Sequence, residues 1–419
     1  MTPPHFLPFL HPREMLMRIF FLLAVVAVLG ARAEEAVAEA PVVAWNITHL
    51  EAVRERLHQN DAALTPALER LRLDADKSIE GPPAAVTEKV VDATAPSQDP
   101  HDFVSSSTYH WPDEKDPQAP WVWKDGQFNQ PMIDRYDYTR LKRMTARVTD
   151  GTLAWWFTGE TRYADAAVQQ LRVWFIAKET RMNPHLEFAQ FIPNKDGNRG
   201  HPYGIIDARN LVPMLSAVAL LEKGTLLPVE DRTALRAWFR AYLTWLTESR
   251  LGQEEGKATN NHSIFYDQQV IACAAFIGDQ QRLQEVLGQF AQRRMAGQIE
   301  PDGSMVRELN RADGATYATF NLTALTQVMV MGKSCGVDLW AWTSSDGRSL
   351  AKATQWFYPF LQGTAWAHSG TFQARKLTDA LVMIGSVTGD PEATAQARAL
   401  DKDVASRRKL LFPLMAGTP

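Results

Sequence analysis

The sequence contains only two cysteines, Cys273 and Cys335, in 419 residues. So few thiols exclude a disulfide-rich scaffold and a cysteine-based zinc site. An oxidising compartment would permit one bridge between them, and the sequence leaves the distance between them open.

The chain also has little net charge, with a formal value of -4. This value argues against a strongly basic nucleic-acid-binding protein. If the partner is anionic, a local cluster of Arg, Lys and His side chains must attract it. The content of 45% hydrophobic and 22% charged residues is typical of a globular protein.

Several common catalytic motifs are absent. The sequence has no His-Glu-x-x-His motif, no phosphate-binding glycine loop and no nucleophile elbow. The pairs His101-Asp102 and His185-x-Glu187 lack further ligands at a recognised metal-binding spacing. We therefore expect no cofactor and no required metal.

The N-terminus has the pattern of an export signal. The basic residues Arg13 and Arg18 precede the apolar run 19–29, and Ala31-Arg32-Ala33 then resembles a cleavage site. The run is short for a membrane span, so a stable membrane partner is not expected, although an uncleaved anchor is the alternative. We predict a signal peptide over 1–33 and a periplasmic or secreted protein.

The rest of the chain is patterned for helices. We expect a helical arm and linker over 34–98, with a helix that begins at the capping box Thr48-x-x-Glu51 and another near 62–77. A long irregular stretch over 81–131 follows, and its aromatic residues argue against disorder.

A weak repeat recurs along the larger part of the chain. In each copy an apolar helical run stops at a glycine, an acidic residue follows, and a new helix begins. The three glycines are Gly159, Gly278 and Gly389. Further helices are expected near 205–222, 230–250, 315–333, 349–361 and 373–386. Paired helices without alternating strands predict an all-α fold, an (α/α) toroid over 99–419.

Polar residues gather in three segments that helix packing alone does not require: 183–204, 260–267 and 307–322. In the second, Asn260 is a natural N-cap, so Asn261 and His262 would lie in the first turn of a helix. The free N–H groups there favour an anion such as a carboxylate. The alternative is an ordinary N-cap with a surface histidine.

The ordered set of these motifs resembles the alginate lyase superfamily over roughly residues 60–400. The residues that carry the resemblance are His101-Asp102-Phe103, Tyr109-His110-Trp111-Pro112, Asn183-Pro184-His185-Leu186-Glu187, Gly204-Ile205-Ile206-Asp207-Ala208-Arg209, Asn260-Asn261-His262, Tyr266-Asp267, Glu308-Leu309, Arg311, Tyr317 and Phe320-Asn321-Leu322. The chain departs from the family at His110, where an aromatic is common, and at Ala312-Asp313-Gly314. These departures leave the exact substrate open.

The resemblance implies a lyase that cleaves an anionic uronate polysaccharide by β-elimination. It implies that Asn261 and Arg311 neutralise the substrate carboxylate together with His262, that Tyr317 is the acid, and that His262 or Tyr317 is the base. A neighbouring arginine would favour an ionised phenol. The predicted substrate-binding residues are Tyr109, Trp111, His185, Glu187, Arg199, Asn260, Tyr266 and Arg307.

Two other classes of function remain open at this stage. A toroid glycoside hydrolase would need two carboxylic acids, for which the candidates are Glu187, Asp207, Asp267 and Glu308. A non-catalytic glycan-binding protein would keep the aromatic residues and tolerate the loss of His262 and Tyr317. The choice among mannuronate, guluronate and glucuronate polymers, endo or exo action and the oligomeric state are also open.

Overall fold

Helices dominate the computed structural model, which describes residues 39–414 except 93 and 125. The described residues belong to one unit. The predicted signal peptide lies outside the described residues.

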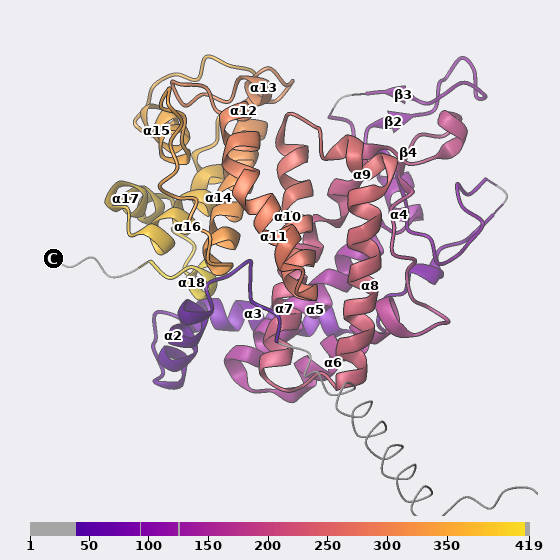
Figure 1. Ribbon diagram of the computed structural model, residues 1–419, viewed down its shortest axis with the longest axis horizontal. Coiled ribbons are helices and arrows are strands. Elements are labelled where there is room, and N and C mark those ends of the chain that lie inside the picture. Colours follow the sequence, from indigo (N-terminus) through magenta and orange to yellow (C-terminus); the bar gives the residue numbers. More distant parts are fainter. Residues whose placement is uncertain (1–38, 93, 125, 415–419) are drawn as a thin grey trace, which may run out of the picture. The chain divides into compact units, whose positions relative to one another are not determined.

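Five helices form an inner layer in which each contacts the next along the chain (Figure 1). They are α5 (Tyr138–Thr158), α7 (Leu211–Lys223), α10 (Asn261–Ile277), α14 (Gly314–Ser334) and α16 (Thr378–Thr388). An outer layer packs against them and consists of α6 (Thr161–Leu171), α8 (Val229–Glu248), α11 (Gln280–Phe290), α15 (Leu350–Leu361) and α17 (Pro391–Leu400). This arrangement confirms the all-α (α/α) toroid.

Helix α10 lies at the centre of the unit and is buried on every side, with mainly apolar residues and the polar Asp267, Gln268 and Gln269. All its residues except His262 and Ile277 are buried, and it contacts α7, α8, α11 and α14. A helix without a polar face belongs in a core rather than at a surface. In the first turn of α10 only His262 is partly exposed, and almost everything after it is buried.

The expected glycine stops are confirmed. Gly159, Gly278 and Gly389 end α5, α10 and α16 with φ values of 76°, 77° and 70°. A residue with a Cβ rarely adopts this left-handed conformation, which reverses the chain into the next helix. The expected helix near 205–222 is divided, because its first part is the 3-10 helix η4 (Pro202–Asn210).

The N-terminal helices α2 (Ile47–His58) and α3 (Thr65–Ile79) share the core of the toroid. The expected capping box at Thr48 is wrong. Asn46 is the N-cap, and its side chain accepts a hydrogen bond from the His49 N–H at 3.3 Å. Both helices contact α18 (Arg408–Leu411), so the beginning and end of the described unit lie side by side (Figure 1).

Short elements connect these layers and provide the few strands. Strand β1 (Val104–Ser106) pairs in parallel with β4 (Phe188–Phe191), and β2 (His110–Trp111) pairs antiparallel with β3 (Val122–Trp123). The remaining elements are η1 (Val86–Glu88), α4 (Gln130–Arg135), η2 (Arg172–Ile176), η3 (Asp196–Asn198), α9 (Arg250–Glu255), η5 (Ala291–Met295), α12 (Ala296–Gln298), α13 (Val306–Leu309) and η6 (Ala374–Leu377).

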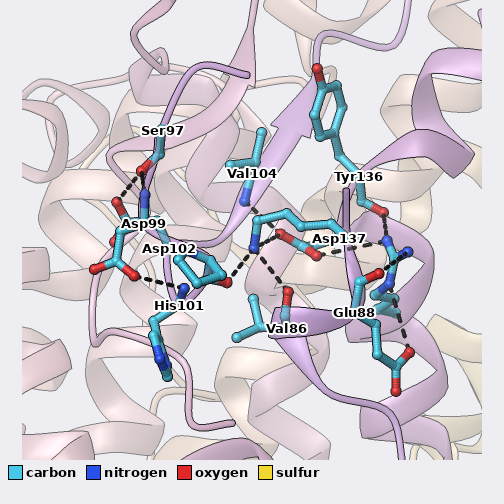
Figure 2. A network of polar contacts seen from close by, with 12 residues as sticks. Val86, Glu88, Ser97, Asp99, His101, Asp102, Val104, Tyr136 and Asp137 are labelled. Atoms are coloured by element: carbon cyan, nitrogen blue, oxygen red, sulfur yellow. Dashed lines mark hydrogen bonds and ion pairs between the residues drawn. The ribbon is translucent and has the colours of Figure 1, made fainter. Parts of the chain in front are cut away.

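A buried ion pair anchors the long segment that includes β1 to β3 (Figure 2). Lys89 Nζ lies 3.0 Å from Asp137 Oδ2, and both side chains are almost completely buried. Asp137 also accepts a hydrogen bond from the Val104 N–H at 2.9 Å. Removing one partner of such a pair costs roughly 3–5 kcal/mol, because the other charge is left buried. The segment is thus fixed beside the toroid.

A second anchor is centred on Asp102 (Figure 2). Its carboxylate accepts hydrogen bonds from Ser97 Oγ at 2.6 Å and Asn183 Nδ2 at 2.7 Å, and it pairs with His185 Nε2 at 3.1 Å. Burial would raise the pKa of Asp102, but the hydrogen bonds from His185, Asn183 and Ser97 outweigh it and hold the pKa at about 2.

We expect Asp102→Asn to lower the free energy of unfolding by about 2 kcal/mol at pH 7, since one pKa unit is worth about 1.4 kcal/mol. The pKa of Asp102 is depressed from 3.8, so its contribution is present above pH 4 and is lost as the pH falls towards 2. Denaturant unfolding of both proteins at several pH values measures this difference. Asp165→Asn is the control, because Asp165 is exposed on α6 and takes no part in this network. A constant difference down to pH 2 would contradict the assignment.

The two cysteines are not bonded to each other. Both are free thiols, Cys273 buried in α10 and Cys335 partly buried after α14. Burial raises the pKa of Cys335 to about 11, which disfavours the reactive thiolate.

Candidate active site

A cleft of about 810 Å³ opens at the first turn of α10. Six of the residues predicted from the sequence line it: Tyr109, Asn260, Asn261, His262, Arg311 and Tyr317. They come from the segment before β2, from the start of α10 and from the start of α14. The structure therefore brings together all four residues predicted to be catalytic.

A buried carboxylate fixes Asn261. Glu308 Oε1 accepts the Asn261 backbone N–H at 2.7 Å, and Asn261 Nδ2 lies 2.9 Å from both Glu308 oxygens. The two oxygens of the Glu308 carboxylate lie too close together to face both hydrogens of the Asn261 amide. Both oxygens therefore contact the same amide hydrogen. The second amide hydrogen is left to bind a ligand.

This contact corrects the expected role of the helix N-terminus. The first N–H of α10 binds Glu308, so a substrate carboxylate would not find that group free. Asn260 is the N-cap as expected, but its side chain makes no capping hydrogen bond. Burial raises the pKa of Glu308, although the hydrogen bonds from Asn261 act in the opposite direction.

A second carboxylate holds His262. The distance from His262 Nδ1 to Glu255 Oε1 is 2.8 Å, and Glu255 ends the short helix α9. The side chain of Glu255 is only 4% exposed, whereas that of His262 is 23% exposed. Because Nδ1 is occupied, Nε2 is the nitrogen that His262 can offer to the cleft.

Arg311 and Tyr317 are stacked on each other. The guanidinium carbon of Arg311 lies 3.9 Å from the centre of the Tyr317 ring. Such a stack is worth about 0.5–2 kcal/mol and holds a cation against the phenol. Among the described residues, Arg311 forms no ion pair with a protein carboxylate, so its charge is available to a ligand.

Ser369, from a distant part of the chain, fixes the turn between these two residues. Its Oγ lies 2.5 Å from the Arg311 carbonyl oxygen and accepts the Gly314 N–H at 3.0 Å. The Ala315 N–H donates to the Ser369 carbonyl oxygen at 3.0 Å. The loop after α15 thus holds the backbone on which Arg311 and Tyr317 are placed.

Three further cations, Lys142, Lys195 and Arg209, line the cleft. Two buried carboxylates, Asp207 and Glu255, also line it. Asp207 accepts hydrogen bonds from Ser105 Oγ at 2.6 Å and Gln190 Nε2 at 2.7 Å. Burial raises the pKa of Asp207 to about 6 even though both groups donate to it. The wall of the cleft is therefore richer in positive than in negative charge.

Aromatic rings from the β2–β3 hairpin form one edge of the cleft. Tyr109 packs edge-on against Trp123 at 5.0 Å and Phe128 at 5.1 Å, and the latter two are largely exposed. Sugar rings stack well on such surfaces. Trp111 was predicted to bind substrate as well, but its ring does not line the cleft. Its indole N–H donates to the Gln127 carbonyl oxygen at 3.0 Å.

The structure does not bring five other predicted substrate-binding residues into the cleft. His185 pairs with Asp102, Glu187 accepts the Trp245 indole N–H at 2.6 Å, and the Tyr266 hydroxyl donates to the Leu246 carbonyl at 3.1 Å. These side chains have structural partners within the protein. Arg199 and Arg307 are exposed, and Arg307 binds Thr259 Oγ1 at 2.7 Å.

The four carboxylates considered for a hydrolase do not form a pair. Only Asp207 lines the cleft. Asp267 makes a buried two-pronged ion pair with Arg294 at 2.7 and 2.8 Å, while Glu187 and Glu308 have the partners described above. A glycosidase needs two carboxyl groups facing the same sugar bond, and these four residues do not offer that arrangement.

Several residues that line the cleft were not predicted from the sequence. Lys142 resembles any surface charge on a helix, and Lys195 lies in a polar loop, so neither carries a local signal. Glu255 belongs to the polar run 252–256, where nothing indicates that one glutamate is buried. Arg209 is the last residue of the recognised motif 204–209, and its place in that motif was the one indication of a role in the site.

The described residues contain no group of three or more His, Cys, Asp and Glu side chains placed to hold a metal ion. The groups that could stabilise a carboxylate in the cleft are instead the guanidinium of Arg311 and the amide of Asn261. Metal independence stays a prediction for the assay described below.

Comparisons with known proteins identify the fold and the family. A computed superposition with the crystal structure of an alginate lyase from Bacteroides ovatus has a TM-score of 0.84 at 31% identity, and covers 90% of this chain and 100% of that one. Alginate lyase A1-III from Sphingomonas species A1 gives a TM-score of 0.59 at 16% identity over 90% of this chain and 97% of that one, which supports the fold alone. A comparison with curated protein sequences finds no match.

The fold and cleft thus define a polysaccharide lyase built on a helical toroid. Residues 86–367 match the alginate lyase family, and the chain belongs to that family.

Proposed function

We propose that the protein cleaves a 1,4-linked uronate polymer by β-elimination, with the mannuronate of alginate as the first candidate. The observation that carries the proposal is the meeting of Asn261, His262, Arg311 and Tyr317 in one cation-lined cleft. A variant of the Sphingomonas enzyme has been crystallised with a tetrasaccharide, which agrees with a sugar-binding cleft in this fold.

The charge of the cleft suits an anionic polymer. Lys142, Lys195, Arg209 and Arg311 line it, and none of them forms an ion pair within the described part of the chain. Each can face a carboxylate of the substrate without first breaking an ion pair, and the one hydrogen bond of Arg209 is to the Ile206 carbonyl oxygen at 3.1 Å. Positive charge in a cleft also raises the local concentration of an anionic ligand.

The proposed reaction begins with loss of the proton on C5 of the uronate. The electrons of that C–H bond form a C4–C5 double bond, and the bond from C4 to the bridging oxygen breaks. Negative charge builds up on the neighbouring carboxylate, where Arg311 and the free amide hydrogen of Asn261 can stabilise it. Tyr317 gives its proton to the leaving oxygen, and His262 Nε2 or the Tyr317 phenolate accepts the C5 proton.

Glucuronan is the second candidate substrate. Mannuronate and glucuronate differ at C2, which is remote from the reacting bonds, whereas guluronate differs from mannuronate at C5, where the proton is removed. The same catalytic residues therefore suit the first two polymers equally, and contacts to the C2 hydroxyl decide between them.

An ultraviolet assay of the purified protein against polymannuronate, polyguluronate and glucuronan tests the proposal, because elimination leaves an absorbing unsaturated uronate. Absorbance should rise with the number of new reducing ends, and a chelator should not change the rate. New reducing ends without absorbance would indicate a hydrolase. Binding without cleavage of any polymer would indicate a glycan-binding protein.

We further propose that the mature protein begins at Glu34 in the periplasm or outside the cell, on the pattern of the apolar run 19–29 and Ala31-Arg32-Ala33. N-terminal sequencing of active protein from the native host measures this directly. An intact apolar run in that protein would show an uncleaved anchor instead.

A further inference from the structure

Glu255, one of the two carboxylates in the cleft, has no part in the reaction proposed above. Glu255 is buried and makes its hydrogen bond to the imidazole of His262. It is held rigidly, because α9 begins at Ser249, whose Oγ accepts the Gly252 N–H at 3.0 Å. Gly252 also packs so closely on the end of α8 that an added Cβ would lie 1.9 Å from the Leu246 carbonyl oxygen.

This contact decides which nitrogen of His262 carries the proton. A carboxylate only accepts hydrogen bonds, so the neutral imidazole must be protonated on Nδ1. Its lone pair is then on Nε2, the nitrogen that is left for the cleft. If the hydrogen were on Nε2 instead, His262 could not take a proton from the substrate.

We propose that Glu255 is a positioning residue of the reaction: it fixes the tautomer and orientation of His262 and stabilises the imidazolium formed when His262 accepts the C5 proton. The proposal rests on the proposed elimination. It adds a requirement for Glu255, which acts through His262, and a prediction about the pH dependence of turnover.

Other charges also surround His262. Asp207 from η4 and Glu308 from α13 are close enough to interact with it electrostatically, and Arg209 and Arg311 line the same cleft with opposite charge. Among the described residues, only Glu255 forms a hydrogen bond with the ring. A substitution at Glu255 leaves these other groups in place, so the effects can be separated.

The test is Glu255→Gln, which keeps the size of the side chain and removes its charge. We expect kcat to fall on the order of 10²-fold with little change in KM, because the glutamine amide can donate to Nδ1 and stabilise the wrong tautomer. The residual activity should have its acidic limb at a lower pH, because His262 then loses its proton more readily. A purely structural role of Glu255 would lower Tm without moving this limb.

Glu254→Gln is the matched control, since Glu254 is the preceding residue of α9, is exposed and pairs with Arg250 at 2.9 Å. It should leave kcat and the pH profile unchanged. A wild-type-like profile in folded Glu255→Gln would overturn the proposal.

Nitrogen-15 NMR of the wild-type histidines gives a reading that does not depend on activity, with the His262 signal assigned from its loss in His262→Ala. We expect neutral His262 to carry its hydrogen on Nδ1. A hydrogen on Nε2 would overturn the role of Glu255 even if Glu255→Gln fails to fold. An inactive wild type with the Nδ1–H tautomer would refute the proposed elimination and leave the contact with Glu255 intact.

Discussion

Tyr317→Phe should lower kcat on the best polymer by about 10⁴-fold or more while the protein stays folded. Loss of one general acid or base costs about 10²–10⁴-fold. The upper end applies because Tyr317 is the proposed acid and can also be the base. The ring itself, and its stack on Arg311 at 3.9 Å, remain in the variant. Initial rates by ultraviolet absorbance, with circular dichroism and melting to verify folding, measure the effect.

A comparison of KM with kcat separates a defect in the chemical step from a loss of substrate affinity. KM should change much less than kcat, because the proton of Tyr317 is needed mainly when the bridging oxygen leaves. Tyr358→Phe, on α15 and outside the cleft, is the control and should retain full activity. If folded Tyr317→Phe kept most of its turnover, another residue would have to be the acid.

The toroid could be predicted because its determinants are local. The stops at Gly159, Gly278 and Gly389 each depend on one residue and its neighbours, and the structure confirms all three. The apolar periodicity of the helices is likewise visible in a short window of sequence. The capping box at Thr48 failed because Asn46, two residues earlier, provides an equally good cap.

Residues of the site could be predicted only where they belong to a recognised motif. Asn261, His262, Arg311 and Tyr317 belong to recognised motifs, and the fold brings them into one cleft. His185 and Tyr266 lie in similar motifs, yet their side chains bind Asp102 and the Leu246 carbonyl. A motif specifies which residues are present, whereas the direction of a side chain depends on tertiary packing.

The supporting roles of the two carboxylates Glu308 and Glu255 could not be predicted from the sequence. Glu308 lies 47 residues from Asn261 along the chain, and its contact exists only because α13 packs against the start of α10 and α14. Glu255 is closer in sequence to His262, but its burial depends on the packing of α9 against α8 and η4. Together they hold two consecutive residues of α10 in fixed orientations, which is what precise proton transfer requires.

His262→Ala should remove most of the activity, and the remainder should depend on the configuration of the substrate at C5. In mannuronate and glucuronate the C5 proton and the bridging oxygen lie on the same face of the ring, so Tyr317 can serve both. In guluronate they lie on opposite faces, and a single tyrosine cannot reach both. We therefore expect a loss of about 10²–10⁴-fold on the first two polymers and a larger loss on any guluronate activity of the wild type.

Added imidazole provides the decisive readout for this variant, because Ala leaves a space beside Glu255 in which a free imidazole can take the place of the ring. If His262 transfers a proton, imidazole should restore part of the turnover on guluronate and should do so with the pH dependence of its own ionisation. His262→Gln is the control, since its longer side chain fills that space and should prevent the rescue. A loss that is equal on both C5 configurations and that imidazole does not reverse would mean that His262 only neutralises charge, and Tyr317 would then be the base as well as the acid on mannuronate and glucuronate.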